Sequence, residues 1–251
     1  STTLATNACV EGKGGRARLI LMGTDEKVME WIDAKTRYGL RPEDVLCVDA
    51  RTGFDGSVEE TPDWEKVMAE HDEWLRDAQA LAVTELNAPR NGAVCEREAR
   101  KALSARYSVP LVLAGELTNE LNIMERGATA LLNARLLPVI DEFLQAVRRA
   151  LDARGIRAER MIVRSDGSLM SEAHARTAPV QTILSGPAAS VVGSRVLAGS
   201  ENCLIVDMGG TTTDVSIVRG GQPRRTDGIR IGGYRTQIGG VYIDTFGLGG
   251  D

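Results

Sequence analysis

The residues of this chain best suited to chemistry lie in one short run, NCLIVDMGGTTTDVSIV, at positions 202–218. Two acids bracket two glycines and three threonines, in the order Asp207, Gly209, Gly210, Thr211, Thr212, Thr213 and Asp214. Apolar and β-branched residues flank the run on both sides, a pattern typical of two strands. The sequence therefore predicts a tight turn between paired strands at the edge of a sheet.

Each residue type in this turn suits the binding of a phosphate group. Glycine permits positive φ and lets a ligand approach the backbone closely. Successive N–H groups in such a turn form an anion-binding concavity, and threonine hydroxyls add further donors. Acids at this place would repel a bare phosphate, but Asp207 and Asp214 fit if Mg²⁺ lies between them and the phosphate and keeps several waters. The turn is thus predicted to be a phosphate–metal loop.

Other interpretations of the turn differ in what they require. A Walker loop needs G-K-[ST] followed by a helix, and neither is present. A dinucleotide-binding fingerprint also needs a helix after its glycines. One alternative stays open: a glycine-rich hairpin without a ligand, in which Asp214 and the threonines bond the N–H groups of the turn itself.

The first part of the chain alternates strands with helices. Apolar runs at residues 17–23, 43–50, 78–86 and 109–115 predict buried strands. Between them, residues 24–37, 63–76 and 91–107 have helical periodicity, with Thr24 and Asn91 as candidate N-caps. This alternation predicts a parallel, doubly wound α/β layer.

The later part of the chain changes character. Residues 116–155 are helical in pattern, and Pro138 inside them predicts a kink or two helices. A helix of small residues follows at 186–198, with Pro187 in its first turn. The stretch 228–238 is predicted to be one strand, and the best domain boundary comes directly after Gly199.

Composition excludes several classes of function. The chain has 251 residues, is 43% hydrophobic and carries a net charge of −5, so it has no broad basic surface for nucleic acid. Its 4 cysteines form no C-x-x-C pair, which favours reduced thiols in the cytoplasm, and 2 histidines argue against a His-rich zinc site. No apolar stretch reaches the roughly 18 residues of a membrane span.

Several stretches also resemble a known family. Residues 185–218 resemble the connecting helix and second phosphate loop of the actin, heat-shock chaperone and sugar kinase ATPase superfamily. Within it, the chain is most similar to the hydantoinase/oxoprolinase family. That likeness rests on STTLATNACVEGKGG at the start, ERGATALLNARLLP from residue 125, PVQTILSGPAASVVG from residue 179 with Ser190 where glycine is usual, and GGVYIDTFGLGGD at the end.

The resemblance implies an α/β fold of the actin-like ATPase (ribonuclease H-like) class. Family members begin with a first phosphate loop that would precede residue 1, so the chain is expected to be a central fragment, incomplete at both ends. Residues 1–199 would be the remainder of the first domain, with a helical insert near 116–155 and a connecting helix at 186–198. Residues 200–251 would begin the second domain, with its phosphate loop at 207–214.

The resemblance also implies an activity: ATP-dependent opening of a cyclic amide such as a hydantoin or 5-oxoproline, by phosphorylation of the amide oxygen. Asp207 would be catalytic, holding Mg²⁺ through water or orienting the attacking oxygen, and Asp214 would be a second metal ligand. The glycines and threonines at 209–213 would grip the β- and γ-phosphates of ATP. A second subunit or an oligomer is expected, and the isolated chain should hydrolyse ATP poorly.

Two other functions stay open on the sequence. One is an actin-like ATPase that switches conformation on a protein partner, as reactivating factors do, and the other is a subunit of an ATP-dependent ketone carboxylase. The substrate separates them, because a cyclic amide should stimulate an amidase and a protein should stimulate a switch. The substrate, the oligomeric state and the roles of Thr2, Thr3, Asn7 and Asn133 are not fixed by the sequence.

Overall fold

A computed structural model describes residues 3–250 of the chain, so Thr2 lies outside the described residues. The described residues form two compact units: unit 1 holds residues 3–7, 142–229 and 238–250, and unit 2 holds residues 8–141 and 230–237. The predicted boundary after Gly199 falls inside unit 1. The prediction that the family's two domains divide after Gly199 stays a prediction.

Unit 2 is built on a parallel sheet. Its strands are β1 (Ala17–Met22), β2 (Val45–Val48), β5 (Ala80–Glu85) and β6 (Leu111–Leu113), in the spatial order β2-β1-β5-β6. All three pairings are parallel, with Ile20 paired to both Leu46 and Val83. Every residue of β5 is buried, as expected for a central strand covered on both faces. The predicted parallel α/β layer is confirmed.

Short helices connect these strands: α2 (Glu26–Trp31), α3 (Ala34–Tyr38), α4 (Trp64–Glu70), α5 (Asp72–Arg76), α6 (Ala88–Asn91) and α7 (Val94–Ser104). Ala99 and Leu103 of α7 are buried in one core with Ile20 and Val83 of the sheet. The N-cap of α2 is Asp25, whose carboxylate accepts from Val28 N at 2.8 Å, so the prediction of Thr24 was off by one residue. A hairpin of β3 (Arg51–Thr52) and β4 (Val58–Glu60) fills the segment after β2.

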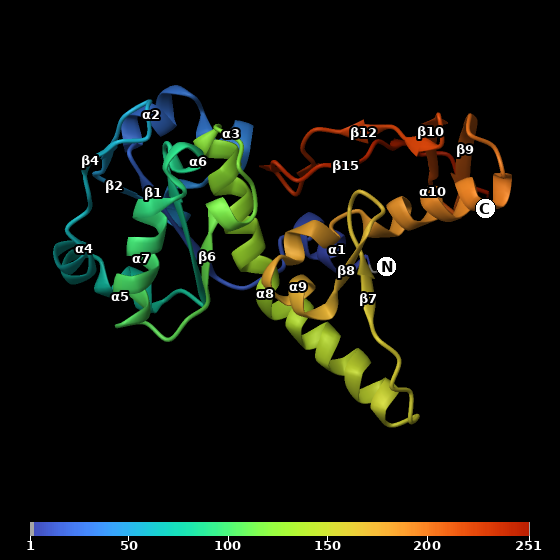
Figure 1. Cartoon of the computed structure of the whole chain (residues 1–251), viewed down its shortest axis with the longest axis horizontal. Helices are drawn as coiled ribbons and strands as arrows, with labels where there is room; N and C mark the ends of the chain where they lie inside the picture. Colours follow the sequence, from blue (N-terminus) through green and yellow to red (C-terminus); the bar gives the residue numbers. More distant parts are fainter. Residues whose placement is uncertain (1–2, 251) are drawn as a thin grey trace. The chain divides into compact units, whose positions relative to one another are not determined.

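Residues 123–152 form one helix, α8 (Ile123–Asp152), which Figure 1 shows as a single long coil. The predicted interruption at Pro138 is therefore not a break into two helices. Proline removes one backbone hydrogen bond, but Leu136 and Ile140 on either side of it are buried and packing holds the helix together.

The stretch predicted as a last long strand is instead a two-stranded hairpin of unit 2, β13 (Arg230–Ile231) and β14 (Tyr234–Arg235). Gly232 and Gly233 both have positive φ, which is what the tightest hairpin turns require, and this splits the strand. The hairpin region binds α8, because Arg235 pairs with Glu125 at 2.6 Å and Gln237 N donates to Thr129 Oγ1 at 2.9 Å.

Unit 1 combines helices with an antiparallel sheet. Its elements before the sheet are the hairpin β7 (Met161–Val163) and β8 (Leu169–Ser171), then α9 (Glu172–Thr177) and α10 (Ser185–Ala198). The sheet contains β9 (Cys203–Met208), β10 (Thr213–Arg219), β11 (Gln222–Pro223) and β16 (Asp244–Phe246), and β12 (Arg225–Thr226) pairs with β15 (Gly240–Val241).

The core of unit 1 lies between α10 and the sheet. Ala188 and Val191 of the helix pack with Ile205 of β9 and Val218 of β10. On the opposite face of β9, Leu204, Val206 and Met208 are exposed. No helix within residues 3–250 combines the length and the apolar character needed to cross a bilayer.

Candidate functional site

The seven residues singled out by the sequence meet at the closed end of the β9–β10 hairpin. The two strands pair antiparallel from Cys203 opposite Val218 to Met208 opposite Thr213. Gly209 N donates to Thr212 O at 2.8 Å and closes the turn. The predicted strand–turn–strand is present, and no helix follows it.

The two acids of the turn are direct partners in the hairpin, Asp207 opposite Asp214. Directly opposed residues share a face of the sheet with Cβ atoms roughly 4.5–5.5 Å apart. Side chains alternate between faces, so the acids share the face of Ile205 and Val218, beyond the end of the core. Asp207 is exposed, whereas Asp214 is half-buried and accepts a hydrogen bond from Thr245 Oγ1 at 2.7 Å.

This acid pair fits Mg²⁺ that arrives with a phosphate. Within residues 3–250 no group of three or more His, Cys, Asp or Glu side chains is placed to hold a metal. Magnesium usually binds through one or two carboxylates, substrate phosphates and waters, rather than a complete protein cage. Two facing carboxylates, which otherwise repel each other, match the number of protein ligands that such a site takes.

The turn residues divide by exposure. Gly209, Gly210, Thr211 and Thr212 are exposed, so the hydroxyls of the two threonines are open to a ligand, whereas the N–H of Gly209 is already bonded to Thr212 O. Thr213 is buried, and its hydroxyl donates to Leu248 O at 2.6 Å. The hydroxyl of Thr213 thus fixes the turn to the segment after β16.

Gly209 does not use the positive φ that glycine permits, and a Cβ there would meet its nearest neighbour, Thr212 O, at 3.4 Å. The need for glycine arises on the other side of the turn. A Cβ on Gly249 would overlap the carbonyl of Gly210, and Gly250 N donates to Gly209 O at 2.9 Å. Two glycine-rich segments therefore pack backbone to backbone.

Sequence reasoning did not assign this second segment, residues 245–250, to the site. Its strand β16 pairs with β10 so that Phe246 lies opposite Thr213 and Thr245 opposite Asp214. The only signal in the sequence was the pair of glycines in GLGG, which indicates a close backbone approach without naming its partner.

The structure places the polar residues whose roles the sequence leaves open, where they are described. Thr6 of α1 (Leu4–Val10) accepts from Leu184 N at 2.9 Å, directly before α10. Leu184 has positive φ, which a non-glycine residue adopts only where its surroundings hold it. Thr3 O accepts the helical bond of Asn7 N, and Asn133 is fully buried in α8.

Comparison with known proteins shows the family of the chain. The sequence profile of the hydantoinase/oxoprolinase family matches residues 126–251, and that of the family's N-terminal region matches residues 1–107. The chain belongs to the hydantoinase/oxoprolinase family.

Three relatives show the range of the family. The chain is 25% identical to caprolactamase subunit alpha of Pseudomonas jessenii, over 99% of the chain and 38% of that protein. It is 38% identical to 5-oxoprolinase 1 of Arabidopsis thaliana, over 52% of the chain and 10% of that protein. It is 26% identical to the acetophenone carboxylase gamma subunit of Aromatoleum aromaticum, over 87% of the chain and 33% of that protein.

The fold is shared with a solved structure. The crystal structure of ATP-dependent caprolactamase from Pseudomonas jessenii superposes with a TM-score of 0.85 and 24% identity, over 100% of this chain and 39% of that one. The hydantoinase/oxoprolinase chain is mixed α/β with a parallel sheet, in agreement with the predicted actin-like ATPase class. It spans less than two fifths of the caprolactamase subunit.

Proposed function

We propose that the protein to which this chain belongs is an ATP-dependent hydrolase that opens a cyclic amide of the hydantoin or 5-oxoproline type. The observation that carries the proposal is the facing pair of Asp207 and Asp214 beside an exposed Gly–Gly–Thr–Thr turn. The caprolactamase and 5-oxoprolinase relatives support the reaction class.

The proposed roles follow from the position of each group. The backbone of Gly210 and the hydroxyls of Thr211 and Thr212 bind the β- and γ-phosphates of ATP, while the N–H of Gly209 closes the turn onto Thr212 O. Asp207 holds Mg²⁺ through water or orients the attacking oxygen, and Mg²⁺ neutralises phosphate charge when bound. Asp214 is the second acid, held in place by Thr245.

Thr213 stays in the proposed set as the residue that anchors the turn through Leu248 O. Phosphoryl transfer is catalysed mainly by such positioning and by charge neutralisation. Amides are poor electrophiles, and transfer of the γ-phosphoryl group to the amide oxygen activates the ring carbon. Water adds to that carbon and the C–N bond breaks as the nitrogen takes a proton, which opens the ring. A second water then cleaves the acyl phosphate to a carboxylate and inorganic phosphate.

The remaining parts of the activity are also proposals. Because the chain spans 38% of the caprolactamase subunit, we place the opposing phosphate loop and the amide-binding site in the rest of the protein or in a second subunit. Two of the relatives are named as subunits. We also propose a cytoplasmic location, which the four free cysteines support.

The test is an Asp207→Ala substitution in the whole protein, with ATP hydrolysis measured across a panel of hydantoins, 5-oxoproline and lactams. We expect one amide class to stimulate the unsubstituted protein and the variant to lose that turnover. Asp227→Ala is the matched control, because Asp227 is an exposed acid of the same unit outside the hairpin. Full turnover in the Asp207 variant would remove the hairpin from the mechanism.

A ketone carboxylase is the second candidate, favoured by the 26% identity to the acetophenone carboxylase gamma subunit over 87% of the chain. It predicts ATP turnover that requires both a ketone and bicarbonate. ATP turnover that responds to a protein and to none of these small molecules would favour a conformational switch.

A further inference from the structure

Unit 2 contains a cavity of about 270 Å³ that the proposed reaction does not use. Four parts of the chain line it: the end of α1 with the loop after it, the α3 segment, one face of α8, and the β13–β14 hairpin. All of its lining residues belong to unit 2, whereas the phosphate loop belongs to unit 1.

The floor of the cavity is apolar. It consists of Leu132 and Leu136 of α8, Tyr234 of β14 and Cys9 of α1, all of them buried. Burial raises the pKa of the Cys9 thiol to about 11, so at neutral pH this wall carries no negative charge. A bound molecule would therefore meet an uncharged, mostly hydrocarbon surface here.

The backbone fixes the shape of the cavity. A Cβ on Gly232 would overlap the carbonyl of Cys9, and a Cβ on Gly39 would lie 2.8 Å from Gly233 O. Both glycines have positive φ, so the close approach and the backbone conformation each require glycine. The walls are thus already in place, as is usual for small-molecule sites.

The rim of the cavity is basic, with Lys13, Lys35, Arg41 and Arg135 among its lining residues and no acid in the described lining. Two of these charges have partners, since Lys13 pairs with Glu11 at 2.6 Å and Arg41 pairs with Asp44 at 2.7 Å.

The other two charges of the rim are less fully neutralised by neighbouring acids. Lys35 forms no ion pair with any residue in the described part of the chain. Arg135 is held by Tyr234 Oη at 3.1 Å, and Asp44, its nearest carboxylate, is 3.9 Å away. The Arg135 side chain is only 17% exposed, so its position is fixed before any ligand arrives.

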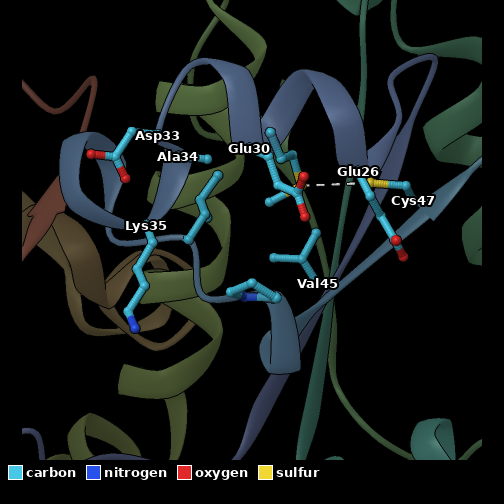
Figure 2. Close-up of a pocket in the computed structure, with 10 residues that line it drawn as sticks. Glu26, Glu30, Asp33, Ala34, Lys35, Val45 and Cys47 are labelled. Carbon is cyan, nitrogen blue, oxygen red and sulfur yellow. Dashed lines mark hydrogen bonds between the residues drawn. The ribbon is translucent and has the colours of Figure 1, made fainter.

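A neighbouring cavity has an acidic lining instead of a basic one. It holds about 300 Å³, and its lining includes the acids Glu26, Glu30 and Asp33 beside the stem of Lys35. Figure 2 shows the Lys35 side chain running away from Glu30 and Cys47, with its amino group directed out of this acidic pocket. The charge of Lys35 is therefore available to the basic cavity.

We propose that the basic cavity binds a small anion with one or two carboxylate or phosphate groups and, at most, a short apolar portion. Arginine presents a planar fork that binds either group through two hydrogen bonds, and lysine adds a point charge. At about 270 Å³ the space lies just below the usual range for drug-sized ligands, which suits a small anion. The site is separate from the proposed ATP loop and does not depend on its function.

The test is calorimetric titration of the full 251-residue chain with inorganic phosphate and, separately, with succinate, at constant ionic strength set by chloride. We expect saturable one-to-one binding of at least one of the two, weakening as chloride rises. Binding of phosphate alone assigns the phosphate class, binding of succinate alone assigns the carboxylate class, and binding of both assigns a general small-anion site.

The variants Lys35→Gln and Arg135→Gln should each weaken this binding by about tenfold or more. The Lys35 side chain is exposed and forms no ion pair within the described residues, so its variant tests the site even if Arg135→Gln unfolds. Lys101→Gln is the matched control, an exposed lysine of unit 2 on α7 that should leave binding unchanged. Absence of binding by both anions, or equal binding in Lys35→Gln, overturns the proposal.

Discussion

Asp207 and Asp214 lie directly opposite each other across the β9–β10 hairpin, on the same face of the sheet. Like charges in this relationship repel, and the repulsion costs stability unless a cation lies between them. The repulsion lowers the stability of the hairpin, and a bound cation would restore it. The acid pair can therefore be tested without any substrate.

The first prediction concerns this acid pair. Asp207→Asn keeps the shape of the side chain and removes one charge, so without Mg²⁺ it should raise the free energy of unfolding by about 0.2–1 kcal/mol. Urea unfolding with and without Mg²⁺ measures the effect, and Mg²⁺ should stabilise the unsubstituted chain more than the variant. Asp227→Asn serves as the control. A variant less stable than the parent would contradict the repulsion.

The second prediction concerns the close approach of two backbones. Gly249→Ala places a methyl group on the carbonyl of Gly210, which must move the turn and should cost about 1–3 kcal/mol. Gly247→Ala is the control, because a Cβ at Gly247 meets nothing within 4 Å. The two variants are compared by the nucleotide affinity of the whole protein and by thermal unfolding. Equal behaviour of the two variants would show that the segment is not packed on the turn.

The third prediction separates two threonines of the same turn. Thr213→Val removes a buried hydroxyl from Leu248 O and should lower the free energy of unfolding by about 1–3 kcal/mol. Thr211→Val changes an exposed residue and should leave stability within about 0.5 kcal/mol while weakening ATP binding. Chemical unfolding and nucleotide titration of both variants test this division. If Thr211→Val lowered stability and Thr213→Val weakened only ATP binding, the proposed roles of the two threonines would be exchanged.

The fourth prediction concerns a charge pair in the core of unit 2. Glu96 and Arg126 are both fully buried and joined at 2.7 Å, and Glu96 also accepts from Gly115 N at 2.8 Å. Removal of one partner leaves a buried charge alone, so Glu96→Ala should cost about 3–5 kcal/mol.

Glu98→Ala is the control for this pair, because Glu98 is exposed on the same helix and its loss should change stability by less than about 0.5 kcal/mol. Urea unfolding of both variants makes the comparison. A small effect of Glu96→Ala would mean that the Arg126 guanidinium finds another partner.

Local patterns predicted the hairpin well. The β-branched runs around residues 202–218 are enough to indicate a hairpin, and the hairpin alone brings Asp207 opposite Asp214. The alternation of buried strands with helices likewise predicted the parallel sheet, because both features are encoded within short windows of sequence.

Contacts between distant residues were not predictable in the same way. The approach of Gly249 to Gly210 depends on the pairing of β16 with β10, and nothing near GLGG names that partner. Pro138 was expected to interrupt a helix that tertiary packing keeps whole. The pattern of residues 228–238 suggested one strand, whereas Gly232 and Gly233 turn the chain back on itself.

The hairpin at residues 230–237 also sets the timing of folding during synthesis. It completes unit 2 by closing over Cys9 and by bonding Thr129, which precedes Gln237 by 108 residues. Ribosomes add roughly 5–20 residues per second, so for several seconds a nascent chain holds the sheet of unit 2 without its last piece. The basic cavity is therefore among the last features of the chain to form, and a protein cut after α8 would never acquire it.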